Sequence, residues 1–224
     1  MQHDVRVATT SRTDRGVHAL GLPVGFETSM DISDYGLMRG LNSRLPADLK
    51  VHEVKEMPSG WRVRWASVAK TYVYRYQIGK VALPLWRRRS YYIKRPTLNV
   101  DAMIAAAPRL EGIHDFGAFR AAQCQATQTI RKMHSVRVRR TVDPDIVELE
   151  ITGSGFLQYM VRIMAGTLLQ VGIDQRKAES IDELLECGDR TLGGPTLPPH
   201  GLTLIKVFFE GYPKFTVQNE IQVD

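Results

Sequence analysis

Apolar and polar residues alternate over several short stretches of this chain, which is the pattern of β-strands with one buried face. The alternation is strongest in "AKTYVYRYQI", residues 69–78, where Tyr72, Tyr74, Tyr76 and Ile78 share one face. Further extended stretches are predicted at 4–10, 21–28, 51–57, 133–140, 145–153 and 202–210. The turn-forming "TVDPD" at 141–145 predicts that the two strands flanking it form a hairpin.

Other stretches have the spacing of helices. Residues 31–46 place Leu37, Met38 and Leu41 on one face before Pro46 ends the pattern. Helices are also predicted at 99–112, disturbed by Pro108, at 155–171 and at 178–187. Because strands and helices interleave in both halves and at least one hairpin joins strands, the fold class is predicted to be α+β with a largely antiparallel sheet.

A loop rich in proline and arginine separates the two halves of the pattern. Its sequence, "ALPLWRRRSYYIKRP", differs from the periodic stretches on either side. We therefore expect an N-terminal α+β half at 1–80, a basic connecting loop at 81–98, a C-terminal α+β half at 99–212 and a tail at 213–224.

Composition narrows the class of protein without naming a function. The chain has 224 residues, of which 43% are hydrophobic and 24% charged, as in ordinary globular proteins. A net charge of +6 favours polyanionic partners. Cys124 and Cys187 form no ligand or disulfide framework, and we expect buried, reduced thiols. With no signal-peptide pattern and no membrane span, we expect an intracellular protein, first of all cytoplasmic, with nucleus or organelle as alternatives.

The stretch "SRTDRGVHAL" concentrates charge in one turn. Asp14 and Ser11 can shape or cap this turn among solvated arginines, as in many proteins. Alternatively, Asp14 is a nucleophile or base that a nearby cation, Arg12 or another, keeps ionised. Gly16 would then allow the sharp turn that brings a substrate close, whereas His18 is interpreted as structural.

Arg162 interrupts the apolar stretch "FLQYMVRIMAG". A buried arginine needs an acidic partner, and its neighbours in this segment offer none. The side chain either reaches the surface, pairs with an ordinary structural acid, or supplies the cation that Asp14 requires. The sequence alone leaves these alternatives open.

The tyrosines of residues 69–78 also have two interpretations. Packing in the core is favoured over a platform on which nucleic-acid bases stack. Several cations lie near these tyrosines in the sequence, and they either bind phosphates or form a solvated face. They are Arg62, Arg64, Lys70, Arg75 and Arg87–Arg89.

Five blocks in order resemble the TruA family of tRNA pseudouridine synthases. They are "SRTDRGVHALG", "RVRWASVAKTYVY", "EGIHDFGAFRAAQCQATQTIRKM", "GFLQYMVRIMAGTLLQVG" and "LPPHGLTLIKV". The family patterns that they resemble are R-T-D-x-G-V-H-A, A-R-x-S-A-x-x-[KR]-x-Y-x-Y, G-x-H-D-F-x-x-F, F-L-x-x-M-V-R-x-[IM]-x-G-x-L and A-P-x-x-G-L-x-L-x-x-V. The blocks extend over nearly the whole chain, and their common order is more specific than any one of them.

The resemblance implies a site, position by position. Asp14 would be the catalytic nucleophile, Arg162 its ion-pair partner, and Tyr72 a group that stacks on the target uracil and takes part in proton transfer. The implied substrate-binding residues are Arg12, which displaces or orients the base, Leu202, which packs against it, and the cations Lys70 and Arg64. No cofactor and no metal is implied.

The resemblance also implies a fold, a substrate and an assembly. Two ferredoxin-like (RRM-like) halves would share one extended sheet, and the chain would act as a homodimer on tRNA, with no membrane. The family-typical target is the anticodon stem-loop of tRNA, positions 38 to 40, and the reaction converts uridine to pseudouridine. Since "MQHDVRVATTSRTD" opens without the family's Y-D-G-x-x-[FY]-x-G-W-Q loop, the first half is expected to lack its initial strand and helix. The alternative function is a catalytically impaired relative that keeps the tRNA surface without turnover.

Overall fold

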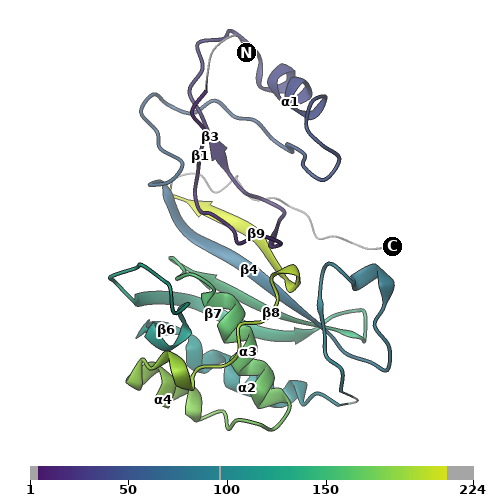
Figure 1. The fold of residues 1–224 in the computed structure, drawn as a ribbon. Helices are drawn as coiled ribbons and strands as arrows, with labels where there is room; N and C mark the ends of the chain where they lie inside the picture. The colour runs from purple at the N-terminus through teal and green to yellow at the C-terminus, as the bar shows by residue number, and fades with distance from the viewer. Residues whose placement is uncertain (1–4, 96, 211–224) are drawn as a thin grey trace. The chain divides into compact units, whose positions relative to one another are not determined.

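The computed structural model describes residues 5–95 and 97–210, and these divide into two compact units (Figure 1). The first unit comprises Met1–Thr10 with Pro23–Ala66, and the second comprises Ser11–Leu22 with Ser67–Asp224. The two units therefore alternate along the chain, and Ser11–Leu22 of the second unit lies between the two segments of the first. The predicted tail at 213–224 lies outside the described residues, as do residues 1–4.

The first unit is small and contains little regular structure. Strand β1 (Ala8–Thr9) pairs antiparallel with β3 (Val24–Gly25), within two of the predicted extended stretches. Helix α1 (Asp34–Asn42) confirms the helical spacing, and the Ser33 hydroxyl caps it by accepting from the Gly36 N–H at 3.2 Å. The strand predicted at 51–57 is wrong, because these residues pair with no strand and are mostly exposed.

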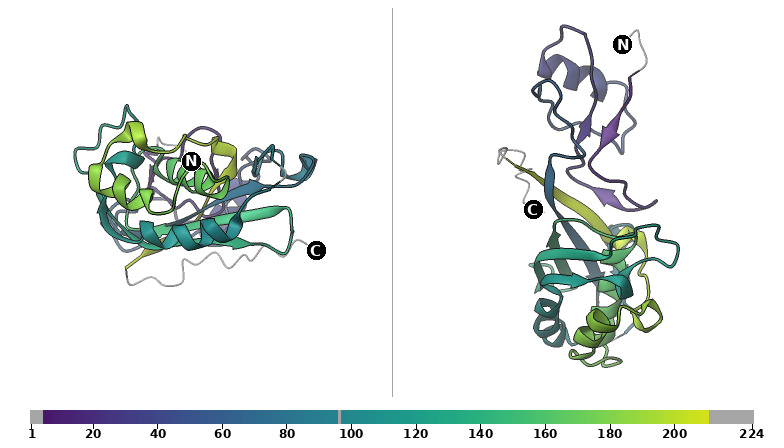
Figure 2. Two further views of the ribbon diagram at one scale, coloured as in Figure 1. Left: turned by 90° about the horizontal axis from the view of Figure 1, so that it is seen from below. Right: turned by 90° about the vertical axis from the view of Figure 1, so that its left-hand side faces the viewer.

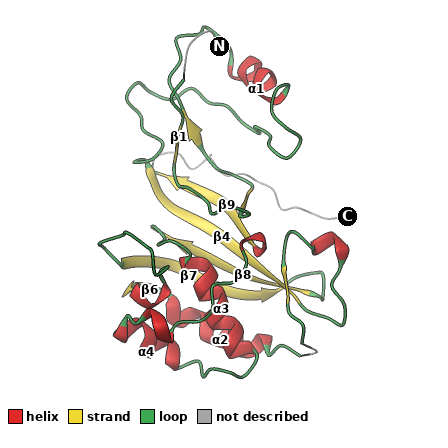
Figure 3. Cartoon of the chain, viewed as in Figure 1, coloured by secondary structure: helices red, strands yellow, loops and turns green. Residues whose placement is uncertain are grey.

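A seven-stranded sheet forms the body of the second unit (Figure 3). Its order is β2-β9-β4-β8-β7-β6, with β5 paired to β4. The strands are β2 (His18–Ala19), β4 (Ser67–Gln77), β5 (Tyr91–Tyr92), β6 (Gly112–Asp115), β7 (Ile130–Arg140), β8 (Ile146–Gly153) and β9 (Leu202–Phe209). All pairings are antiparallel except β2 with β9 and β4 with β5. The mainly antiparallel α+β class is confirmed, and so is the β7–β8 hairpin.

Helices of the second unit gather beside this sheet (Figure 2). Helix α2 (Val100–Ala106) continues as a 3-10 turn (Ala107–Leu110) because Pro108 cannot donate to the α-helical ladder. It runs beside α3 (Met160–Gly172), where the Asn99 N–H donates to the Gly172 carbonyl at 2.8 Å, and α4 (Ser180–Cys187) follows. The predicted helix at 155–171 thus begins five residues later than expected.

The core lies between the central strand β4 and α3. Tyr74 and Tyr76 are fully buried there, together with Leu149, Met164 and Leu168. Burial of this apolar surface is the main source of stability for the unit. The cysteines differ from expectation, since both are free but Cys187 is exposed and Cys124 only half-buried. Among the described residues, no helix is long and apolar enough to cross a membrane.

Candidate active site

The "SRTDRGVHAL" stretch forms a tight turn that is fixed to the edge of the sheet. The Val17 N–H donates to the Asp14 carbonyl at 3.0 Å, and Gly16 has a φ of 86°, which favours glycine. A Cβ at Gly16 would lie 3.2 Å from Cγ of Pro199. Directly after the turn, β2 pairs in parallel with β9. The position of Asp14 is therefore set through β9, the last of the described strands along the chain.

Arg162 pairs with Asp14. Its Nη1 donates to Oδ2 of Asp14 at 2.9 Å, and its Nε donates to the Leu197 carbonyl at 2.6 Å. The side chain of Arg162 is only 12% exposed and that of Asp14 is 29% exposed. The prediction that Arg162 requires an acidic partner is thus confirmed, and the pair brings together two of the predicted site residues.

Tyr72 lies next to this ion pair. It is buried in β4, with its ring edge-on to Phe156 at a centroid distance of 5.0 Å. Burial raises the pKa of its hydroxyl, and the negative charge of Asp14 acts in the same direction, whereas a hydrogen bond with Ser11 opposes them. The phenol therefore stays protonated at neutral pH and can donate a hydrogen bond.

The other two tyrosines of β4 belong to the core. The Tyr74 hydroxyl donates to the Pro198 carbonyl and the Tyr76 hydroxyl to the Ala165 carbonyl, each at 2.9 Å. Burial raises the pKa of both hydroxyls. The interpretation of these two residues as core packing, rather than a base-stacking platform, is confirmed.

The remaining predicted site residues differ in their surroundings. Arg12 is exposed two residues before Asp14. Lys70 is buried in β4, where burial lowers the pKa of its ammonium group. Leu202 is buried at the start of β9 and pairs with Tyr74. Arg64 is exposed and belongs to the first unit.

Two neighbours of the ion pair were missed by sequence reasoning. The ring of Tyr159 stacks on the Arg162 guanidinium, with 4.6 Å between the guanidinium carbon and the ring centroid. Tyr159 lies directly before α3 in a left-handed backbone conformation, so helical spacing does not place its ring and no side-chain pattern predicts it. The Leu197 carbonyl is a backbone group, and no side-chain pattern points to it.

His18 connects the same turn to the basic loop. Its Nε2 lies 2.6 Å from the Arg88 carbonyl oxygen, within hydrogen-bonding distance. The side chains of Arg87–Arg89 are exposed and have no ion pair or hydrogen bond among the described residues. Three unneutralised cations thus lie on a segment that is bound to the strand following Asp14.

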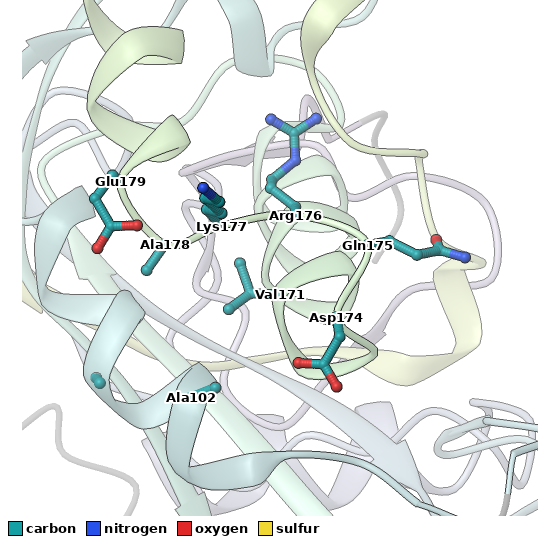
Figure 4. Close-up of a pocket in the computed structure, with 9 residues that line it drawn as sticks. Ala102, Val171, Asp174, Gln175, Arg176, Lys177, Ala178 and Glu179 are labelled. Atoms are coloured by element: carbon teal, nitrogen blue, oxygen red, sulfur yellow. The ribbon is translucent and has the colours of Figure 1, made fainter.

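The described residues show no metal centre, and one surface pocket lies away from this site. Over residues 5–95 and 97–210, no three His, Cys, Asp or Glu side chains gather in a way that could hold a metal ion. A pocket between α2 and the α3–α4 connection is lined by Val171, Asp174, Arg176 and Glu179, among others (Figure 4). Arg176 is bound there by Gln170, Ser180 and the Leu192 carbonyl, so its charge serves to fasten this connection.

Comparison with known proteins identifies the family. A family model described as tRNA pseudouridine synthase matches residues 106–210. The tRNA pseudouridine synthase A of Geotalea daltonii is 40% identical over 92% of this chain and 83% of its own length. This chain belongs to the tRNA pseudouridine synthase family. Similar relatives of the same name occur in Geobacter sulfurreducens, 39% identical over 93% of this chain and 84% of their own, and in Burkholderia thailandensis, 37% identical over 95% and 76%.

Membership in the family confirms the resemblance drawn from the five sequence blocks, and with it the predicted enzyme class, pseudouridine synthase. The aligned relatives match more than nine-tenths of the chain. The family model alone covers α3 and β9 but not the turn of Asp14. The role of each side chain is a separate question.

Proposed function

We propose that this protein converts uridine to pseudouridine in tRNA, with Asp14 as the nucleophile. The observation that carries the proposal is the ion pair of Asp14 and Arg162 beside Tyr72, in a chain of the pseudouridine synthase family. The Asp14 carboxylate accepts a hydrogen bond from the Arg162 guanidinium at 2.9 Å, and a carboxylate held in place can act as a nucleophile.

The proposed reaction is an isomerisation with balanced bonds. The C1′–N1 bond breaks, a C1′–C5 bond forms, C5 loses a proton and N1 gains one. The Asp14 carboxylate attacks either C1′ of the ribose or the ring of the base, and the covalent adduct holds one fragment while the base turns. No electrons are exchanged with a cofactor, and no water is consumed overall.

The neighbouring side chains have proposed roles that follow from their positions. Tyr72, protonated and rigidly packed, would contact the uracil ring and donate a hydrogen bond or proton to it. Arg12, exposed on the same turn, would occupy the space that the flipped nucleotide leaves or orient its phosphate. Leu202 would form an apolar wall, and Lys70 and Arg64 would contribute positive charge toward the substrate.

The proposed substrate, tRNA, agrees with the charge of the protein. The unneutralised Arg87–Arg89 segment supplies cations that can bind phosphates, next to the strand that follows Asp14. The anticodon stem-loop, positions 38 to 40, is the proposed target, and an intracellular location follows from a tRNA substrate. Two ferredoxin-like halves and a homodimer are also part of the proposal. In support of the fold, β4, α2, β7, β8, α3 and β9 occur in the βαββαβ order along the chain, with β5, β6 and α4 between them.

The experiment measures release of tritium from tRNA labelled with [5-³H]uridine, because the C5 hydrogen leaves only when pseudouridine forms. Wild-type protein is expected to release tritium, and Asp14→Asn, which keeps the shape of the side chain, is expected to release none above background. Mapping the pseudouridines in the product then tests the target positions. Equal release by both proteins would refute the nucleophile, and tight tRNA binding by an inactive wild type would favour the impaired relative.

A further inference from the structure

Tyr159 has an uncommon backbone conformation at the start of α3. Its φ is 63° and its ψ is 3°, in the left-handed region that glycine and asparagine adopt far more readily than aromatic residues. Among the described residues, only Asp174 shares this property outside glycine. A conformation that costs free energy and persists at a functional site needs a compensating contact.

The surrounding contacts hold the backbone of Tyr159 in place. The carbonyl of the preceding residue, Gln158, accepts from the Ala121 N–H at 2.9 Å, and the Tyr159 carbonyl accepts from the Ile163 N–H at 3.0 Å, which begins the helix. The left-handed residue thus forms the corner between the loop and α3. From this corner the Tyr159 ring reaches the guanidinium of Arg162, one turn along the helix.

The guanidinium of Arg162 is held by two hydrogen bonds and lies over an aromatic ring. Nε donates to the Leu197 carbonyl and Nη1 donates to Asp14, and both hydrogen bonds lie along the edge of the planar group. The Tyr159 ring contacts the group 4.6 Å away. The two hydrogen bonds fix the edge of the guanidinium, and its position over the Tyr159 ring adds a third contact that opposes its movement away from Asp14.

We propose that Tyr159 is a positioning residue that keeps Arg162 on Asp14 when the polyanionic substrate binds. This proposal rests on the proposed function, in which a phosphate-rich chain enters the site. Phosphate competes with carboxylate for a guanidinium, because both accept paired hydrogen bonds from it. Stacking on Tyr159 stabilises the guanidinium where it meets Asp14, so that the approach of a phosphate does not draw Arg162 away.

The sequence position supports a role particular to this chain. In the pattern F-L-x-x-M-V-R, Tyr159 occupies the second of the two unspecified positions. Phenylalanine at this position would keep the ring. Asparagine would keep the left-handed backbone at lower cost but remove the ring. The pair Tyr159→Phe and Tyr159→Asn therefore separates the contribution of the ring from that of the backbone.

The first test is steady-state pseudouridine formation with tRNA. Tyr159→Phe is expected to match wild type, whereas Tyr159→Asn is expected to lose about tenfold in kcat, the scale of one cation–π contact, with KM changed less than twofold. A thermal unfolding curve confirms that Tyr159→Asn is folded. Equal kcat for Tyr159→Asn and wild type, or equal losses in both variants, would overturn the proposal.

The second test does not depend on activity. The Nε–H resonance of Arg162, assigned by its disappearance in Arg162→Lys, is expected to be shifted upfield by the Tyr159 ring. It should keep this shift in Tyr159→Phe, lose it in Tyr159→Asn, and become broader in Tyr159→Asn alone when an excess of inorganic phosphate is added. An unchanged resonance in Tyr159→Asn would overturn the proposed positioning role of Tyr159, even if the enzyme is active. If the predicted shifts are observed but the wild-type protein releases no tritium, the proposed function is refuted while the contact between Tyr159 and Arg162 stands.

Discussion

Asp14 and Arg162 are 148 residues apart in the chain, and their side chains meet at 2.9 Å. The two partners are unequally buried, at 29% and 12% exposure. Loss of one charge therefore has different consequences on the two sides, because water can solvate the carboxylate more readily than the guanidinium. The ion pair also couples stability to the proposed activity.

Asp14→Ala is expected to lower the free energy of unfolding by about 2–3 kcal/mol, because it leaves Arg162 charged and buried without its partner. Arg162→Met on the same background is expected to restore part of this loss, since a thioether of similar length removes the unpaired charge. Urea unfolding of wild type, both single variants and the double variant measures the coupling. Strictly additive losses would show that the pair contributes nothing as a pair. Neither of the two single variants is expected to be active, and nor is the double variant.

Gly16→Ala is expected to abolish most activity, because a side chain at φ 86° strains the turn and its Cβ would crowd Pro199. The stability loss is expected to be about 1–3 kcal/mol. Gly188→Ala is the matched control, since Gly188 has a φ of 65° with nothing within 4 Å of the added Cβ. Both variants should lose stability, but only Gly16→Ala should lose tritium release. An equal loss of activity in both would mean that the turn has no special role.

Stability is expected to fall as pH rises above about 10, the ordinary tyrosine pKa. Tyr72, Tyr74 and Tyr76 have folded-state pKa values raised by burial, so the unfolded chain releases their protons first, and each contributes a slope of up to about 1.4 kcal/mol per pH unit. Lys70, whose pKa is lowered, contributes the opposite sign. Tyr76→Phe should make the decline between pH 10 and pH 11 shallower by about one proton, as measured by urea unfolding at each pH. An unchanged slope would contradict this assignment.

Replacing Arg87–Arg89 by alanine is expected to weaken tRNA binding and to reduce the slope of log affinity against log salt by about 2–3. Each phosphate contact releases counterions when tRNA binds, and the variant would make fewer such contacts. The control removes the same charge elsewhere on the second unit, at the exposed Lys132, Arg137 and Lys177. Filter binding over a salt series measures both. A larger effect of the control variant would exclude the basic loop from the tRNA surface.

The sequence predicts the parts of this molecule that local pattern controls. The alternation in residues 69–78 gives β4, and the spacing of Leu37, Met38 and Leu41 gives α1. In the stretch 51–57 the apolar residues Val51, Val54 and Met57 stand at every third position, and none of the described strands pairs with it. A strand needs both an alternating pattern and a partner, and this stretch has neither.

The part of the candidate site that was predictable is the ion pair, because a buried charge requires a partner of opposite charge. A buried Arg162 implies an acid, and the family resemblance selects Asp14. The Leu197 carbonyl and the left-handed Tyr159 depend on the path of the backbone, which no local pattern of side chains encodes. The exposure of Cys187 likewise follows from its place at the end of α4, on a helix with only one buried face.

The pairing of strand β2 with β9 determines the stage of synthesis at which the turn of Asp14 can be fixed. Its residues follow Asp14 along the chain, and among the described strands its partner is β9, which ends at Phe209. During synthesis Asp14, the proposed nucleophile, therefore leaves the ribosome long before β9, and Arg87–Arg89 and helix α3 emerge in between. The proposed site is therefore expected to assemble late, once β9 has been made and has paired with β2.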